Sequence, residues 1–263
     1  KTAEDDSPKK SSRNSTSSKT PSKNQSEEEV QAIDPDDVPE GFTLAQLSPY
    51  FEKVQLGTVS PGSETKNLRI RLTANLEEGE TVDITGWRIR GNRNFETISQ
   101  AINAYSPFGS QKLEDVILKD RDFVNIYSTN SPLGKGVHLN KCMGYIENHF
   151  EFDPDLGASC PKIEETPVLP TLTGACQEYV SSLGRCEESE SNPPGVSLED
   201  RACREYLKDF NYRGCYEKHS QDEDFFERKW VLWIGPDGKF LDFEHDRVLL
   251  FDLNGLLVDL KTY

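Results

Sequence analysis

The sequence predicts a mainly β protein, a β-sandwich that is interrupted by an α-hairpin. Three observations predict this class. Short apolar stretches alternate with a period of two and are separated by Gly, Pro and Asn at intervals of roughly ten residues, a pattern typical of sandwiches and barrels. Between residues 175 and 210 the apolar period becomes helical. All six cysteines lie within residues 142–215, as a compact disulfide framework requires.

The composition limits the classes of partner. The chain has 263 residues, 30 Lys and Arg against 46 Asp and Glu, and a formal net charge of −16. This acidity argues against nucleic acid, because phosphate is repelled unless the protein has a concentrated basic patch. A basic patch on the folded surface would favour a nucleic-acid binder again. No apolar run approaches the length of about 18 residues that a membrane-spanning helix needs.

Residues 1–48 are predicted to be a disordered linker rich in Ser and charge. Residues 1–29 contain eight Ser, six Lys or Arg and six Asp or Glu, with Ala3 as the only hydrophobic residue. Such a stretch buries too little apolar surface to offset the entropy lost on ordering. The fold is expected to begin at Pro49. We also expect a signal or membrane anchor upstream of Lys1, from which this linker would hold the folded part at a distance.

Strands are predicted from residue 54 onward, with Trp87 and at least one later tryptophan in the core. The Asp237-Gly238 and Asn254-Gly255 pairs are the residues that tight hairpin turns require. The predicted strands and hairpins cover residues 54–59, 68–72, 82–89, 95–98, 116–118, 123–127, 230–240 and 248–260.

Two helices are predicted within a Cys-rich insertion of residues 153–227, over residues 175–183 and 198–210. Ser197 precedes two acids and is expected to cap the second helix. Gly184 and Gly214 follow the helix ends, where a left-handed cap is expected.

Two stretches of the sequence resemble the motifs of a known family. Val82-Asp-Ile-Thr-Gly-Trp-Arg-Ile89 places Gly-Trp before a hydrophobic residue, and Asp246 to Asp259 fit the pattern D-x-V-x-L-x-D-x-x-G-x-x-V-D. Both resemble the lamin tail domain, an immunoglobulin-like sandwich found in nuclear lamins and in many uncharacterised exported bacterial proteins. The resemblance implies that residues 49–152 and 228–263 form an immunoglobulin-like β-sandwich without catalytic residues. Residues 153–227 depart from the family.

The cysteines are expected to form three disulfides in an oxidising compartment, the alternative being buried free thiols in a cytosolic protein. No Cys-x-x-Cys pair is present, which argues against structural zinc. Fifteen pairings are possible in principle. If the two predicted helices run antiparallel, the start of one faces the end of the other. This arrangement predicts the pairs Cys176–Cys215, Cys186–Cys203 and Cys142–Cys160.

The sequence predicts no catalytic residue, no metal site and no cofactor. His138, His149, His219 and His245 show none of the spacings that metal or catalytic sites use. Neither a nucleophile elbow nor a phosphate-binding glycine loop is present. The acidic runs at 187–190 and 222–224 could bind calcium weakly, but a solvated acidic surface is the favoured interpretation.

Two sets of residues are candidates for binding. Trp230 and Trp233 are three positions apart, so in a strand they point to opposite faces and one of them can be exposed. An exposed indole could stack on a sugar ring. The loop with Glu187, Glu188 and Glu190 is expected to meet a basic or polysaccharide-bearing surface, with binding that weakens as salt rises.

We therefore expect a non-enzymatic extracellular or cell-surface module for structure or protein interaction. It would bind a protein or cell-envelope partner, and it would be exported and membrane-anchored. Two alternatives remain open. Lamin-tail domains also accompany exported hydrolases and nucleases, so this chain could be an accessory domain of such an enzyme, or it could be a carbohydrate-binding surface module. A chromatin binder conflicts with the acidity and the expected disulfides.

Overall fold

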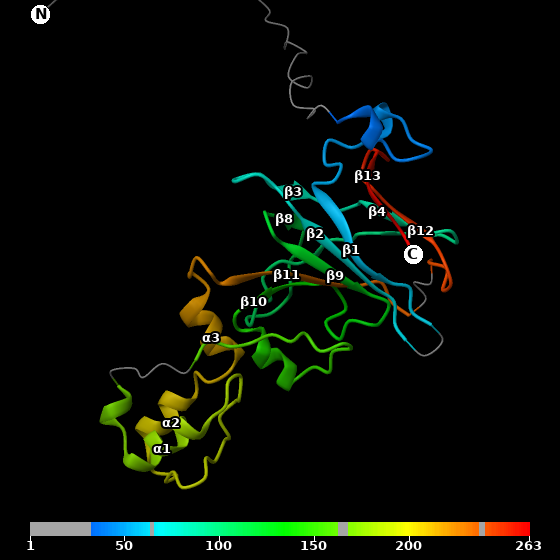
Figure 1. Cartoon of the computed structure of the whole chain (residues 1–263). Helices are drawn as coiled ribbons and strands as arrows, with labels where there is room; N and C mark the ends of the chain where they lie inside the picture. Colours follow the sequence, from blue (N-terminus) through cyan, green and yellow to red (C-terminus); the bar gives the residue numbers. More distant parts are fainter. Residues whose placement is uncertain (1–32, 64–65, 163–167, 237–239) are drawn as a thin grey trace, which may run out of the picture.

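The computed structural model describes residues 33–63, 66–162, 168–236 and 240–263. Of the disordered linker predicted over residues 1–48, residues 1–32 lie outside these ranges. Residues 33–48 are described and contain two short 3₁₀ helices, Pro35–Asp37 and Leu44–Gln46. The described chain is strand-rich, with 13 strands in three sheets and three α-helices, so the prediction of a mainly β fold is confirmed. Figure 1 shows the sheets at one end of the molecule and helices α1 and α2 at the other.

The larger sheet holds seven strands in the order β1-β2-β9-β11-β10-β6-β7. It is mixed, because β9 and β11 pair in parallel whereas β1 and β2 are antiparallel. The strands are β1 Val54–Ser60, β2 Arg69–Ala74, β6 Ala101–Ile102, β7 Leu113–Glu114, β9 Phe123–Tyr127, β10 Val137–Asn140 and β11 Phe226–Trp233. Strands β6, β7 and β10 are not among the predicted strands, because two to four residues are too few to show a clear period of two.

The smaller sheet has the order β13-β12-β4-β5, and β3 and β8 form a two-stranded ribbon. These strands are β3 Val82–Asp83, β4 Arg88–Arg90, β5 Phe95–Thr97, β8 Ile117–Leu118, β12 Arg247–Phe251 and β13 Leu257–Thr262. The single strand expected over residues 82–89 is split by a turn in which Gly86 has a φ of 79°. The Asn254-Gly255 turn between β12 and β13 is confirmed.

The second predicted hairpin is not formed. β11 ends at Trp233, and Phe240, expected on the returning strand, belongs to no strand although it is buried. Asp237 and Gly238 of the expected turn lie outside the described residues. In place of a hairpin partner, β11 pairs with β9 on one side and β10 on the other. A central position in the larger sheet therefore satisfies the backbone of β11 without a local hairpin.

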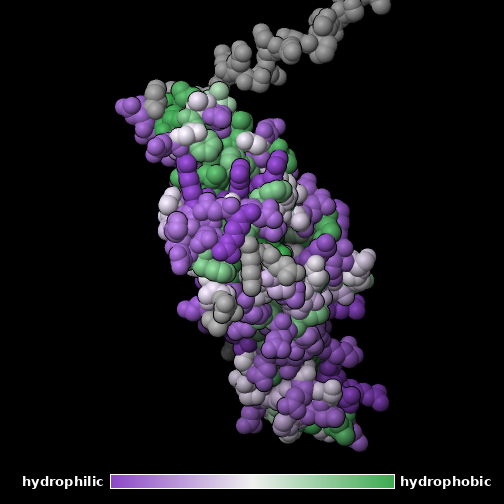
Figure 2. Space-filling model, turned by 90° about the vertical axis from the view of Figure 1, so that its right-hand side faces the viewer, coloured by the Kyte–Doolittle hydropathy of each residue, from purple (hydrophilic) through white to green (hydrophobic). Residues whose placement is uncertain are grey.

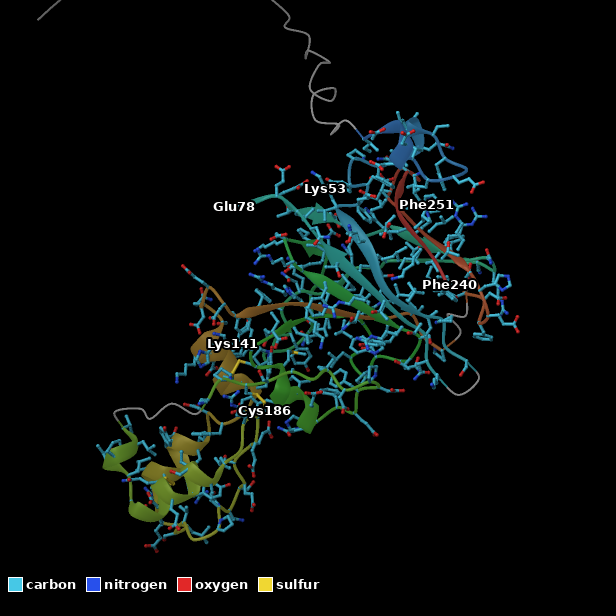
Figure 3. The ribbon with its side chains drawn as sticks, viewed as in Figure 1. Lys53, Glu78, Lys141, Cys186, Phe240 and Phe251 are labelled. Atoms are coloured by element: carbon cyan, nitrogen blue, oxygen red, sulfur yellow. A yellow bond between two sulfur atoms is a disulfide. The ribbon has the colours of Figure 1, made fainter. Side chains whose placement is uncertain are left out.

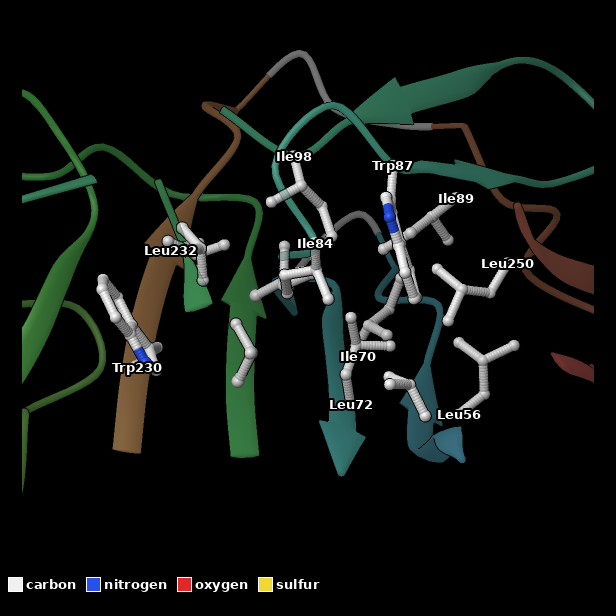
Figure 4. Packing of buried hydrophobic residues seen from close by; sticks show 14 of the residues in the cluster. Leu56, Ile70, Leu72, Ile84, Trp87, Ile89, Ile98, Trp230, Leu232 and Leu250 are labelled. Carbon is white, nitrogen blue, oxygen red and sulfur yellow. The ribbon is translucent and has the colours of Figure 1, made fainter. Parts of the chain in front are cut away.

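The two large sheets share one hydrophobic core, and together they are called the two-sheet body below. Strands of the larger sheet contribute Ile70 and Leu232, and the smaller sheet contributes Ile89 and Leu250. Figure 4 shows Ile70, Ile89 and Leu250 around Trp87, with Leu232 farther along the core near Trp230. Trp87 and Trp230 are 2% and 1% exposed, which confirms the prediction that Trp87 and one later tryptophan fill the core. Rings of this size are among the largest single contributions to burial.

Two further clusters lie outside this core. One covers the opposite face of the larger sheet and includes the 3₁₀ helix Met143–Asn148 and helix α3, Tyr212–His219. The other lies between α1, Gly174–Ser182, and α2, Arg201–Leu207, and has only six buried residues among those described. We call residues 168–219, which carry the three α-helices, the helical segment. Its outer part is held by a core much smaller than that of the two-sheet body.

Side chains connect the two sheets along one edge. Asp259 of β13 accepts a hydrogen bond from the Leu56 N–H of β1 at 2.5 Å, and Lys261 donates to the Gly57 carbonyl. The chain also packs against the smaller sheet before Pro49, the expected start of the fold. Leu47 is buried and forms a bridge with Leu257, and the Ser48 hydroxyl donates to Asp252 at 2.8 Å. The smaller sheet is thus covered at its β13 edge.

Candidate functional site

All six cysteines are in disulfides, so the expected disulfide framework is confirmed, but all three predicted pairs are wrong. The observed pairs are Cys142–Cys215, Cys160–Cys186 and Cys176–Cys203. Three disulfides are compatible with an exported protein. The Cys160–Cys186 bond lies where the helical segment meets the two-sheet body, as the position of Cys186 in Figure 3 shows.

The pairing prediction failed because its premise of antiparallel helices is wrong. The N-termini of α1 and α2 meet: Thr173 caps α1, Asp200 caps α2, and the Thr173 hydroxyl donates to the Asp200 carboxylate at 2.7 Å. Each helix carries a cysteine as its third residue, so Cys176 and Cys203 face each other. The sequence contains a signal for this arrangement, since Ala-Cys-x-Glu-Tyr occurs at residues 175–179 and again at 202–206.

The predicted helix ends also differ from the observed ones. Asp200, and not Ser197, is the N-cap of α2, which ends at Leu207. Gly214 lies inside the additional helix α3, where a Cβ atom would come within 2.2 Å of the Asp209 carbonyl oxygen. Neither Gly184 nor Gly214 is among the glycines with positive φ. The close approach of two backbone segments, and not a left-handed cap, requires the glycine at 214.

The structure does not present the two candidate tryptophans as an open platform. They do point to opposite faces of the sheet, as their spacing predicts. Trp230 is 1% exposed and stacks on His138 with ring centroids 4.2 Å apart. Trp233 is half-buried on the other face, where its ring stacks on Phe152 at 5.8 Å. One of these two indoles was expected to be exposed. Trp230 is buried, and Trp233 is only partly exposed, with one face of its ring against Phe152.

The acidic loop uses two of its three candidate carboxylates internally. Glu187 accepts from the Gly184 N–H at 2.7 Å, and Glu188 lies 2.8 Å from His149 Nε2. Glu190 is exposed, and its backbone N–H donates to the Tyr179 hydroxyl. The loop is therefore held in a fixed shape, but most of its charge already has a partner.

The described residues contain no group of three or more His, Cys, Asp or Glu side chains that could hold a metal ion. The second acidic run, at 222–224, contacts basic groups: Lys141 donates to both Asp222 and Asp224, and His219 lies 2.8 Å from Asp222. The described helices are also all too short or too polar to cross a membrane.

One surface that was not predicted from the sequence is rich in arginine. Arg88 and Arg90 of β4 flank the buried Ile89 and are exposed on the outer side of the smaller sheet. Arg247 of β12 lies on the same side and is half-buried. Among the described residues of these strands, no acidic side chain lies on this face, which we call the arginine face. Residues 40–42 cover part of it: the Glu40 carbonyl accepts a hydrogen bond from Arg247, and the Phe42 ring lies 5.5 Å from the Arg247 guanidinium. Its side chains, assigned from the strand registers, are Arg88, Arg90, Phe95, Thr97, Arg247, Leu249, Phe251, Leu260 and Thr262.

Part of the arginine face is hollowed. A cavity of about 550 Å³ is lined by Arg88, Arg90 and Arg93 together with Asn92, Asn94, Phe95 and Phe251, and by no carboxylate. Of these arginines, Arg93 forms an ion pair with Asp242 at 3.1 Å. The Arg88 guanidinium lies 5.8 Å from the centre of the Phe95 ring. None of the ion pairs within residues 33–63, 66–162, 168–236 and 240–263 involves Arg88, Arg90 or Arg247. Guanidinium groups with amide donors and aromatic rings suit an anionic group.

The arginine face stands out against the charge of the rest of the chain. Residues 153–227 carry 17 Asp and Glu against 7 Lys and Arg, a net charge of −10 out of the total of −16. Figure 2, turned to face the side on which β12 lies in Figure 1, shows strongly hydrophilic side chains next to hydrophobic ones over the upper part of the molecule. The period-two pattern Arg88-Ile89-Arg90 was a sufficient sequence signal, because residues two apart on a strand share a face.

No known family model, curated protein or solved structure matches this chain.

Proposed function

We propose that this protein is a non-enzymatic interaction module of an exported, membrane-tethered protein, and that it binds an anionic partner on the arginine face. The observation that carries the proposal is the carboxylate-free hollow with Arg88 and Arg90 on an otherwise acidic chain. Because Arg88 and Arg90 form no ion pair within the described residues, a partner need not displace an internal carboxylate to bind them.

The fold context supports a scaffold role. The immunoglobulin-like topology that the lamin-tail resemblance implies would make the arginine face one outer face of a sandwich. Three disulfides favour an exported protein. The acidic loop at Glu190, proposed from the sequence as the contact, becomes the weaker candidate because Glu187 and Glu188 bind within the chain.

Binding of poly-L-glutamate to the purified chain, measured by calorimetry at two salt concentrations, tests the proposal. The double variant Arg88→Glu/Arg90→Glu should lose at least about tenfold in affinity, which corresponds to about 1.4 kcal/mol. Binding by the unmodified chain should also weaken as salt shortens the screening length from about 10 Å to about 3 Å. Arg201→Glu with Lys208→Glu makes the same change of charge on α2, far from the hollow, and should keep most of the affinity.

Equal loss in the two double variants would show that net charge alone governs binding, and the arginine face would then have no special role. Absence of binding by the unmodified chain would reject the proposed acidic partner.

Single-stranded nucleic acid is a second candidate, because arginines interleaved with phenylalanine rings also suit stacked bases and phosphates. Oligothymidylate binding stronger than poly-L-glutamate binding, and lost in Arg88→Glu/Arg90→Glu, would favour it. The acidity of the chain and the disulfides favour the first candidate.

A further inference from the structure

Among the described strands, the smaller sheet has one free edge, at β5. Its opposite edge, β13, is connected to β1 by Asp259 and Lys261. Within the part of the chain that the structure describes, β5 pairs with β4 and with no other strand. An edge strand presents unpaired N–H and C=O groups, which form a template for another extended chain.

The direction of the backbone groups of β5 follows from the flanking hydrogen bonds. The Ile98 N–H donates to the Trp87 carbonyl at 2.9 Å, and the Gly91 N–H donates to the Asn94 carbonyl at 2.9 Å. Bonded and non-bonded pairs alternate in an antiparallel ladder. Glu96 is therefore the residue of β5 that bonds to β4, and Phe95 and Thr97 direct their N–H and C=O groups away from the sheet. Within the described part of the chain, no other hydrogen bond reaches these groups.

A pocket lies beside this edge, between the two sheets. It has a volume of about 230 Å³. Ile89, Ile98 and Phe240 form part of its apolar wall, and each is nearly fully buried. Glu96 points inward at the mouth, and burial raises the pKa of its carboxyl. Exposed polar residues, Ser99, Gln100 and Lys135, line its outer part. The inner part at Ile89, Ile98 and Phe240 has the size and the apolar surface that suit one aliphatic side chain.

The two sides of the β5 edge select different side chains. Residues that lie opposite one another in neighbouring strands share a face. A residue added opposite Phe95 or Thr97 would lie on the arginine face, where the Arg88 guanidinium is 5.8 Å from the Phe95 ring. A residue added opposite Glu96 would enter the pocket. The edge thus selects a chain that alternates acidic and aliphatic residues.

We propose that an extended partner peptide of alternating acidic and aliphatic residues adds to β5 as an antiparallel strand, with an aliphatic side chain in the pocket and an acidic side chain at Arg88. The choice of acidic residues rests on the proposed function, whereas the edge and the pocket do not depend on it. Since β5 has three residues, only Phe95 and Thr97 provide backbone bonds to the added strand, and the isolated peptide should bind weakly.

The probe is an acetylated, amidated hexapeptide of alternating Asp and Leu, titrated against the labelled full chain by NMR. Saturable shifts are expected at the amides of Phe95 and Thr97, with a dissociation constant on the order of 0.1–1 mM. In the proposed pairing, the N–H groups of the Asp residues face β5. Methylating the Asp amide nitrogens should therefore lower affinity at least about tenfold, whereas methylating the Leu amide nitrogens should leave it nearly unchanged.

Two protein variants test the same backbone hydrogen bonds by changing the protein in place of the peptide. Thr97→Pro removes the outward N–H without breaking the bonds between Glu96 and β4, and should abolish peptide binding. Thr97→Val keeps the N–H and should bind normally. The methylated peptides use the unmodified protein, so the proposal remains testable even if Thr97→Pro does not fold.

Equal binding of the two methylated peptides, binding that survives in folded Thr97→Pro, or the absence of saturable shifts up to about 5 mM peptide would each overturn the strand addition. The proposed function would stand separately if poly-L-glutamate still bound and still depended on Arg88 and Arg90.

Discussion

At the residue scale, His138 shows how a histidine can be structural in spite of its chemistry. Its ring lies between Phe226 and Trp230, with ring centroids 4.7 and 4.2 Å away. Nε2 lies 2.8 Å from the Glu227 carbonyl, to which it donates. Burial lowers the pKa of His138 from 6.5 to about 4. The neutral imidazole therefore belongs to the folded state at neutral pH.

This pKa predicts a loss of stability in acid. Between pH 6.5 and about 4 the unfolded chain binds a proton at His138 that the folded chain does not, so stability falls as pH falls through this window. The full shift in the pKa of His138 corresponds to about 3 kcal/mol of the free energy of unfolding. The free energy of unfolding can be measured with urea at pH 7 and at pH 4.5. Between these pH values it should fall by about 2 kcal/mol more in the unmodified chain than in His138→Phe.

The comparison with His138→Phe is needed because buried carboxylates change the stability with pH in the opposite direction. Burial raises the pKa of Glu96, Asp122 and Asp259, so these groups favour the folded state as pH falls. Both proteins contain them, and the difference isolates His138. Parallel pH curves for the two proteins would contradict the assigned role.

Single positions were predictable where one local rule decides them. The three-residue spacing of Trp230 and Trp233 was enough to place them on opposite faces. Which of them would be exposed was not predictable, because Phe152, which covers Trp233, is 81 positions away in the chain. Likewise, the need for glycine at 144 has no local signal: a Cβ there would come within 2.2 Å of Cys186 Sγ.

At the element scale, α1 and α2 form a small unit that depends on covalent support. Six buried residues form their cluster, too few to fold independently by the usual relation of core size to stability. The capped N-termini and the Cys176–Cys203 bond hold the two helices together.

Replacing Cys176 and Cys203 by Ser should therefore unfold this unit without unfolding the sheets. By the relation between chain entropy and loop length, a disulfide that closes a loop of 27 residues stabilises the folded state by about 3–4 kcal/mol. Hydrogen exchange in the variant should become fast over residues 174–207, while β9 and β11 remain protected. Simultaneous loss of protection in β9 and β11 would show that the helices and sheets unfold as one unit.

Elements were predictable in proportion to their length. The long strands β1, β2 and β9 show a clear period of two, and α1 shows a helical period. Strands of two to four residues, such as β6 and β10, obtain their partners from residues far away in the sequence. Helix α3 was missed because Gly214 indicates a helix end locally, whereas its place is set by contact with Asp209.

At the scale of the whole molecule, charge is distributed unevenly. Residues 153–227 carry a net charge of −10, and the arginine face lies on the two-sheet body at the other end in Figure 1. Most of the described ion pairs have at least one well-exposed partner and contribute little to stability.

Repulsion within the acidic chain predicts that salt stabilises it. Raising the ionic strength from 0.01 to 0.15 M shortens the screening length from about 30 to about 8 Å, which should raise the melting temperature by about 2–4 °C. Calorimetric scans with NaCl, and with sucrose at equal osmolarity as a control, test this. A fall in melting temperature with NaCl would mean that attractive ion pairs outweigh the repulsion.

The nesting of the disulfides has a consequence for proteolysis. Cys142 and Cys215 are 73 positions apart and enclose the other two pairs, so residues 143–214 belong to a covalent ring. A protease that cuts this ring once leaves both fragments joined through sulfur. Such a nicked molecule would run as a single intact chain on a non-reducing gel and separate into two fragments only after reduction.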